Sequence, residues 1–328
     1  MLDKMKAWTR RWWPRLRKPV TIAFFLLVAA LLFSQARSVD WDEVFAAIRR
    51  LETTAVLAAA GLVVLSYLVH ASFDLYGRAL TGHGLSVPRV LVVSFISYAF
   101  NLNFGALIGG MAFRFRLYSR LGLSPGVITR VLAMSVTTNW LGYLLLSGIV
   151  LSTGMIGLPE SWVSGGALRI VGVVLLLVFA AYMAVTALAR VDEITLRNFR
   201  IPVPSRRMAL LQAVHSMFNW MLLGTIVFLL MPKNDAVTYP VVLGTMLVAA
   251  IAGVVSHVPA GLGVLEAVFV AVLGNVVPQG QLLAAVLVYR ALYYLFPLLV
   301  AGVVYAVTEA VARRKPATGV DPTPAHGS

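Results

Sequence analysis

Long apolar runs follow one another along most of the chain and are separated by short polar stretches. Runs of about 20 apolar residues are typical of helices that cross the hydrocarbon core of a membrane. A transmembrane β-barrel would instead show alternating segments of about ten residues, which this sequence lacks. The clear spans, all predicted to be helices, are 19–35, 53–77, 125–153, 165–189, 207–231 and 281–312.

Two further apolar regions, 89–122 and 238–278, are interrupted by glycine-rich stretches. The first break reads NLNFGALIGG (101–110) and the second reads HVPAGLG (257–263). Irregular backbone at membrane depth must face protein or a water-filled cavity, because lipid cannot hydrogen-bond free amide groups. The alternative is that these glycines serve close helix packing, which is common in membrane proteins. We favour broken helices because two clusters occur at corresponding positions.

The distribution of charge predicts how the chain crosses the membrane. The formal net charge is +14, and 15 of the 27 Lys and Arg residues cluster near the chain ends and in one loop. These clusters lie at 1–18, 190–207 and 313–315, so all three segments are predicted to be cytoplasmic. Nucleic-acid binding is the competing interpretation, but the basic residues flank apolar spans and form no soluble basic face.

This orientation constrains the two broken regions. Region 89–122 must begin and end on the cytoplasmic side, and region 238–278 must begin and end outside. Each is therefore a pair of full crossings or a re-entrant hairpin, and the two open to opposite sides, as in transporters with inverted repeats. The predicted fold class is an all-α polytopic membrane protein. It has about six full transmembrane helices plus two broken or re-entrant helical hairpins in an inverted repeat.

Composition supports one membrane domain. The chain has 328 residues, of which 60% are hydrophobic and 12% charged, with a mean hydropathy of +0.87. Soluble domains carry roughly twice that charged fraction. We divide the chain into a basic cytoplasmic N-terminal segment (1–18), a single transmembrane domain (19–312) and a disordered cytoplasmic tail (313–328). There is no cysteine, which excludes disulfides and thiolate metal sites.

Glu266 and Arg290 are the first candidates for a functional site, because charged groups at membrane depth are costly. Glu266 follows the second break near the start of a helix, where the helix dipole favours a carboxylate. Arg290 lies well inside the last span among tyrosines. An ion pair between them would lower the free-energy cost of burying both charges. Such a pair has either a structural or a substrate-binding role.

Arg114 and Arg116 follow the first break. Residues i and i+2 of a helix lie about 200° apart, so only one of the two guanidinium groups can face a cavity. Arg114 is the candidate ligand for a lipid phosphate, and Arg120 is expected to reach the cytoplasmic headgroups. Interfacial anchoring is the alternative for each of them.

Other polar residues have simpler explanations. Asp74 and Arg78 are spaced i, i+4, which predicts a local ion pair. Mid-span polar residues are expected to form hydrogen bonds between helices; these are Asn139, His215 and Asn219. No HExxH, GxSxG or P-loop motif is present, so we expect no catalytic centre, no ATP hydrolysis and no metal or other cofactor.

Three stretches, NLNFGALIGGMAFRFRLYSRLGLS, PAGLGVLE and YRALYYLFP, together resemble one known family. They are similar to the transmembrane region of the lysylphosphatidylglycerol synthase superfamily, which includes the flippase region of the bacterial multiple peptide resistance factor. The resemblance extends roughly from the second span to residue 312. The matching positions are Gly261, Gly263, Glu266, Arg290 and Pro297. The first stretch departs from the family, because Met111 and Ala112 follow the glycines where an acidic residue is common.

The resemblance implies a stand-alone protein of the bacterial inner membrane that moves or presents a lipid without aminoacylating it. The expected function is ATP-independent translocation, or binding, of a phospholipid, glycolipid or isoprenoid-type lipid. The alternative is a membrane subunit or enzyme of lipid modification acting in trans. Expected partners are lipids with anionic or zwitterionic headgroups, a second copy of the chain, or a lipid-synthesis enzyme.

The hairpin tips are expected to form a cavity near the membrane midplane, lined by Arg114, Glu266, Arg290 and the tyrosines. The substrate-binding residues predicted from the sequence are Arg114, Glu266, Arg290, Asn101, Asn103, His257, Gly261, Gly263, Tyr289 and Tyr293.

The predicted topology can be tested with single cysteines, since the chain has none of its own. Cysteines placed at 82–86 should be unreactive toward a membrane-impermeant thiol reagent added to intact cells. Cysteines placed at 234–237 should react. Labelling of the first set from outside would contradict the orientation derived from the basic residues.

Overall fold

The computed structural model describes residues 41–154, 156, 164–188, 193–196, 199–202 and 204–314. The predicted segment 1–18 and the first span, 19–35, lie outside the described residues. So does the tail from residue 315, whereas Arg313 and Arg314 belong to the last helix.

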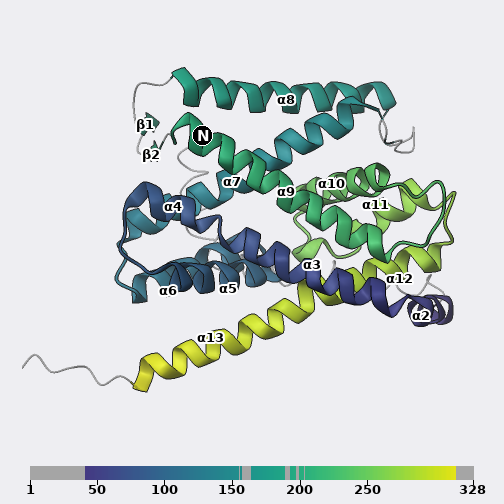
Figure 1. Cartoon of the computed structure of the whole chain (residues 1–328), viewed down its shortest axis with the longest axis horizontal. Helices are drawn as coiled ribbons and strands as arrows, with labels where there is room; N and C mark the ends of the chain where they lie inside the picture. Colours follow the sequence, from purple (N-terminus) through teal and green to yellow (C-terminus); the bar gives the residue numbers. More distant parts are fainter. Residues whose placement is uncertain are drawn as a thin grey trace, which may run out of the picture.

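The described residues form a helical bundle with one short strand pair (Figure 1). In chain order the elements are α2 (Trp41–Arg50), α3 (Thr53–Ala71), α4 (Asp74–Thr81), α5 (Val87–Gly105), η1 (Ala106–Ala112), α6 (Phe113–Arg120), α7 (Pro125–Ser152), α8 (Gly165–Leu188), β1 (Glu193–Leu196), β2 (Phe199–Pro202), α9 (Arg206–Leu230), α10 (Tyr239–Ser256), η2 (Pro259–Gly261), α11 (Val264–Leu273), α12 (Gln279–Arg290), η3 (Ala291–Leu295) and α13 (Phe296–Arg314).

Within the described residues, seven helical stretches are long and apolar enough to cross a membrane. Five of them match the spans predicted from the sequence: α3–α4, α7, α8, α9 and α12–α13. The other two are α5 and α10, which form the first arms of the two broken regions. The prediction of an all-helical polytopic membrane protein is confirmed.

The first broken region is a helical hairpin that reverses at Gly105, whose φ is +83°. The returning η1 turn lies so close to α5 that a Cβ on Gly109 would be 2.1 Å from the carbonyl oxygen of Phe100. The return leads back to the starting end of α5, since the ring of His83 lies 6.4 Å from that of Tyr118. The hairpin therefore enters and leaves at the same end.

The second broken region also returns to where it began. The side-chain amide of Asn234, before α10, donates to the carbonyl oxygen of Val276, after α11, at 3.0 Å. With ten residues, α11 is about 15 Å long, which is half the thickness of the hydrocarbon core. A full second crossing by α11 is therefore excluded.

The two hairpins lie in opposite halves of the molecule, and their inner ends meet (Figure 1). The α5–α6 hairpin is on the left of the view and the α10–α11 hairpin is on the right. Helix α5 packs directly against η2, the turn of the second hairpin. This opposed placement is what the inverted-repeat prediction requires.

Helix starts follow local sequence signals. Ser86, Ser124 and Thr238 each precede a helix with proline in its first two positions, where a missing N–H costs nothing. Before α9, the Ser205 hydroxyl oxygen accepts the N–H of Met208 at 3.3 Å.

The main apolar core lies between α3, α5, α9, α10, α11 and α12. A second core joins α7, α8 and α10. Helix α8 lies along one edge of the molecule against α7 and is mostly exposed, as expected for a helix that faces lipid (Figure 1).

The segment predicted as a basic loop, 190–207, contains a short antiparallel pair in which Glu193 is opposite Pro202. The sequence analysis did not predict this strand pair. Strands of four residues are too short for hydrophobic periodicity to reveal.

Gly109 provides a test of the first hairpin. Gly109→Ala should destabilise the protein by about 1–3 kcal/mol, because the added methyl group meets backbone that cannot move aside. Thermal unfolding in detergent measures the change. The control Gly61→Ala meets no atom within 4 Å and should be neutral or stabilising by up to about 1 kcal/mol. Equal melting temperatures for both variants would contradict the close return of the hairpin.

Candidate functional site

The turn of the second hairpin is a strained stretch of backbone. Four of its residues have positive φ, and two of these, His257 and Ala260, are not glycine. The other two are Gly261 and Gly263, where this conformation is free of steric cost. A non-glycine residue in this region costs about 1–2 kcal/mol, so surrounding contacts must hold the turn.

Arg290 supplies those contacts from the end of α12. Its guanidinium donates to the carbonyl oxygens of Ala260 at 2.9 Å and Gly261 at 2.7 Å. The same side chain is only 8% exposed. Arg290 thus hydrogen-bonds backbone that the broken helix leaves free, in a region where lipid offers no partner.

Glu266 lies in the first turn of α11 and completes the cluster. Both carboxylate oxygens accept from Arg290, one from Nε and the other from Nη2 at 3.0 Å. This two-point geometry is the strong form of the arginine–carboxylate interaction. The predicted ion pair is confirmed, with Glu266 at 17% the more exposed partner.

The first hairpin is fastened to the same cluster through Asn103. Its side-chain amide donates to the carbonyl oxygens of Ala99 at 2.9 Å and Tyr294 at 3.2 Å. The Tyr294 ring in turn lies 5.4 Å from the guanidinium carbon of Arg290. The π-helical turn η3 (Ala291–Leu295) therefore contacts the first hairpin and also Arg290, which binds the turn of the second hairpin.

Hydroxyl groups line the bundle next to this cluster. The Tyr293 hydroxyl lies 2.9 Å from Ser66 Oγ and 3.1 Å from the hydroxyl of Tyr98, and all three residues are buried. Ser66 also donates to Asn219 Oδ1 at 2.8 Å. Tyr289 stacks on Tyr293 with ring centroids 5.4 Å apart. Mid-span Asn219 thus bonds between helices, as predicted.

Arg114 belongs to a different cluster. Its Nε and Nη2 donate to the two carboxylate oxygens of Asp74 at 3.1 Å, and Nη2 also donates to Ser135 Oγ at 3.2 Å. Tyr118 donates to Asp74 at 2.9 Å. Both charged residues are buried, at 5% for Arg114 and 0% for Asp74.

This cluster corrects two expectations. The prediction of an Asp74–Arg78 ion pair is wrong. Arg78 donates to the Leu85 carbonyl oxygen at 2.7 Å, and Asp74 pairs with Arg114. The contacts also do not bring Arg114, Glu266 and Arg290 together around one cavity, as the sequence analysis expected. Arg114 is bound to Asp74 and Ser135, whereas Glu266 and Arg290 bind each other at the second turn.

The remaining predicted residues divide between the two hairpins. Asn101 lies against Gly110, where a Cβ would be 2.7 Å from its Oδ1. His257 is exposed and its Nδ1 donates to the Val255 carbonyl oxygen at 2.8 Å, away from the ion pair. Arg116 is exposed and bonds Glu309, which confirms that only one of the two neighbouring arginines turns inward.

Sequence reasoning missed Asp74 as the partner of Arg114, and it missed Ser66, Tyr67 and Tyr98. Tyr67 donates to the Tyr293 carbonyl oxygen at 2.9 Å. Polar residues at helical spacing in the second span were the available signal.

The architecture and the two paired hairpins define a polytopic helical membrane protein with broken helices at its centre. The chain belongs to the family described as lysylphosphatidylglycerol synthase TM region, whose model matches residues 20–301.

Individual relatives agree with this assignment. The chain is 45% identical to the inner membrane protein YbhN of Escherichia coli over 304 residues, which cover 92% of this chain and 95% of the relative. It is 27% identical over 292 residues to an uncharacterized protein of Synechocystis, covering 87% and 90%. It is also 25% identical over 288 residues to the phosphatidylglycerol lysyltransferase of Staphylococcus haemolyticus, covering 84% of this chain but 32% of that protein.

Breaking the ion pair at the second turn should cost more stability than breaking an exposed ion pair. Arg290→Met should destabilise the protein by about 3–5 kcal/mol, because it leaves Glu266 and two carbonyl groups without their partner. Thermal unfolding in detergent measures the effect. Arg116→Gln, which breaks an exposed pair, should cost about 1 kcal/mol or less. Similar losses in both variants would contradict the role assigned to Arg290.

Proposed function

We propose that this protein moves an amphiphilic lipid between the leaflets of the inner membrane without using ATP. The headgroup is anionic or zwitterionic and passes through the polar centre of the bundle, while the acyl chains stay in the bilayer. Both chain termini lie in the cytoplasm in this proposal, as the basic clusters indicate.

The observation that carries the proposal is the Arg290 cluster. One guanidinium holds a carboxylate and the turn of a broken helix together, and that turn packs against the other hairpin. A lipid phosphate offers the same two-oxygen geometry as a carboxylate. A phosphate that replaces Glu266 on Arg290 would change the contacts of the turn, so lipid binding is coupled to hairpin movement.

The hydroxyl groups beside Arg290 support a polar path. Tyr293, Ser66 and Tyr98 come from three different helical elements and meet at hydrogen-bonding distance. Hydroxyl groups both donate and accept, so they suit phosphate and glycerol oxygens alike. Burying such groups in a membrane bundle is costly unless they pair with one another or with a substrate.

The lipid class is supported by a relative. The similar lysyltransferase acts, by its name, on phosphatidylglycerol, and the family description names a lipid product of the same kind. We extend a phospholipid substrate to this chain as part of the proposal.

A second candidate is a membrane subunit for a lipid-modifying enzyme that acts in trans. It is favoured by one observation: the chain corresponds to only 32% of the lysyltransferase, so the similar region accompanies other sequence there. This candidate predicts a modified lipid when the protein is incubated with a lipid donor and its partner enzyme. Translocation alone predicts unchanged lipids by mass spectrometry.

Lipid movement can be measured in proteoliposomes containing fluorescent phosphatidylglycerol, with dithionite quenching of the outer leaflet. The wild type should accelerate exchange between leaflets over protein-free vesicles. Glu266→Gln should lower the rate about tenfold or more, because it removes the charge that Arg290 exchanges for phosphate.

The matched control is Glu52→Gln, which removes an exposed carboxylate paired with Lys233 and should keep the wild-type rate. Melting temperatures of both variants separate unfolding from lost transport. Equal rates for wild type and a folded Glu266→Gln variant would contradict the mechanism.

A further inference from the structure

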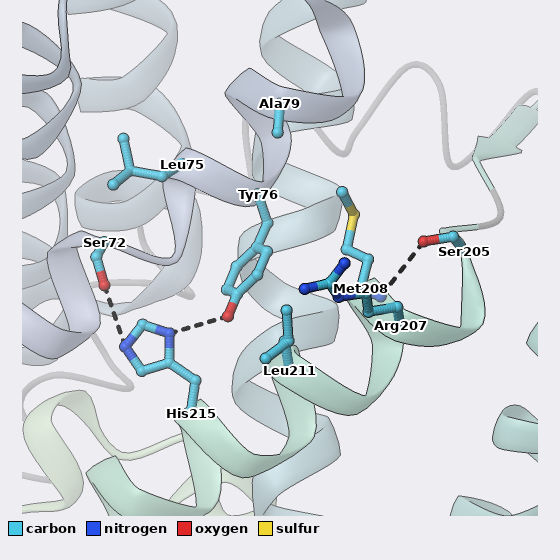
Figure 2. Close-up of a pocket in the computed structure, with 9 residues that line it drawn as sticks. All are labelled: Ser72, Leu75, Tyr76, Ala79, Ser205, Arg207, Met208, Leu211 and His215. Carbon is cyan, nitrogen blue, oxygen red and sulfur yellow. Dashed lines mark hydrogen bonds between the residues drawn. The ribbon is translucent and has the colours of Figure 1, made fainter.

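A groove separate from the ion-pair cluster lies between α4 and the start of α9 and has a volume of about 460 Å³ (Figure 2). Its walls are mainly apolar and include Leu75, Met208 and Leu211. Its polar lining residues are Ser205 and Arg207, at the start of α9, and Ser72, Tyr76 and His215, which we call its floor. None of these residues belongs to the Arg290 or Arg114 clusters described above.

The hydrogen bonds of the floor are all internal. Figure 2 shows His215 between Ser72 and Tyr76, at 3.2 Å from Ser72 Oγ and 3.1 Å from the Tyr76 hydroxyl. The Ser72 hydrogen goes to the carbonyl oxygen of Val69 at 2.6 Å, so Nε2 of His215 donates to Ser72 and Nδ1 accepts from Tyr76. Both hydroxyl hydrogens are therefore occupied, and the floor has none left for an anion.

Arg207 is consequently the strong donor at this groove. Its side chain is exposed, and among the described residues no carboxylate pairs with it. It lies in the first turn of α9, where this span begins. A cation at that level meets lipid phosphates, and guanidinium binds them through two parallel hydrogen bonds.

The groove continues into an exposed apolar stripe along α9. Leu211, Val214, Phe218 and Met221 are all exposed and follow one another at spacings of three and four, so they share one helix face with Arg207. From Arg207 to Met221 the helix rises by about 21 Å, at about 1.5 Å for each residue. That length accommodates an acyl chain lying along the helix beneath a phosphate at its start.

We propose that this groove and stripe form a binding site for one anionic glycerophospholipid. Its phosphate pairs with Arg207, its glycerol region fills the groove between α4 and α9, and one acyl chain follows the exposed face of α9. The site selects charge because its single strong donor is a cation. It selects a lipid over a soluble anion because its walls are apolar and open onto the membrane-facing stripe.

This site does not depend on lipid translocation. It uses no residue of the Glu266–Arg290 cluster, so a lipid bound here is held at the outside of the bundle. Loss of this site and loss of transport through the centre are therefore separable by mutation.

The site can be tested by native mass spectrometry of the full chain released from phosphatidylcholine vesicles that contain a minor fraction of phosphatidylglycerol. The wild type should retain one phosphatidylglycerol in preference to phosphatidylcholine. Arg207→Gln should lower that preference about tenfold, as expected for one charge-assisted interaction. Ala79→Phe, which fills the groove, should reduce retention of the lipid.

Two controls make the result decisive. Arg206→Gln removes a neighbouring exposed charge that does not line the groove and should retain the lipid like the wild type. Glu266→Gln should also retain it, whatever its transport rate. Equal loss in Arg206→Gln and Arg207→Gln would overturn the proposal in favour of general surface attraction. Displacement of the lipid by inorganic phosphate would overturn it in favour of a soluble anion.

Discussion

The guanidinium of Arg290 donates hydrogen bonds to backbone carbonyl groups that the hydrocarbon of a membrane cannot solvate. A helix that breaks inside a bilayer exposes carbonyl groups, and each one costs free energy unless the protein supplies a donor. Arg290 supplies donors to two of them and is itself neutralised by Glu266. The strained turn and the carboxylate of Glu266 are both held by this one side chain.

Both hairpins are held in place by the same kind of interaction. A buried ion pair joins the return arm of each hairpin to a helix outside it: Arg114 of α6 to Asp74 of α4, and Glu266 of α11 to Arg290 of α12. The cation is on the return arm in the first hairpin, and the anion is on it in the second. Removing one partner of such a pair leaves the other as an unpaired buried charge, so the structure needs both. The two pairs therefore hold each hairpin to the rest of the bundle.

The groove between α4 and α9 differs from the centre of the bundle in what surrounds its polar groups. In the centre, polar groups bind one another because the bilayer offers no alternative. At the groove, Arg207 is exposed at the end of a span, and the apolar face below it lies open along α9. A lipid at the groove gains from contact with lipid-like walls, while a headgroup in the centre has to displace existing ion pairs. This difference is why we propose the groove for lipid retention and the centre for lipid passage.

The sequence by itself determined five of the membrane spans and the two breaks, and it marked Glu266 and Arg290 as candidates for a pair, because hydropathy, glycine content and the cost of buried charge can be read along the chain. Only the tertiary structure decided that Asp74 binds Arg114 rather than Arg78, that Asn103 fastens the first hairpin to the last span, and that α4 and α9 enclose a groove. A side chain's partner depends on which helices lie next to each other and which faces they present. Spacing along the chain does not contain that information, since helices far apart in sequence become neighbours only in the packed bundle.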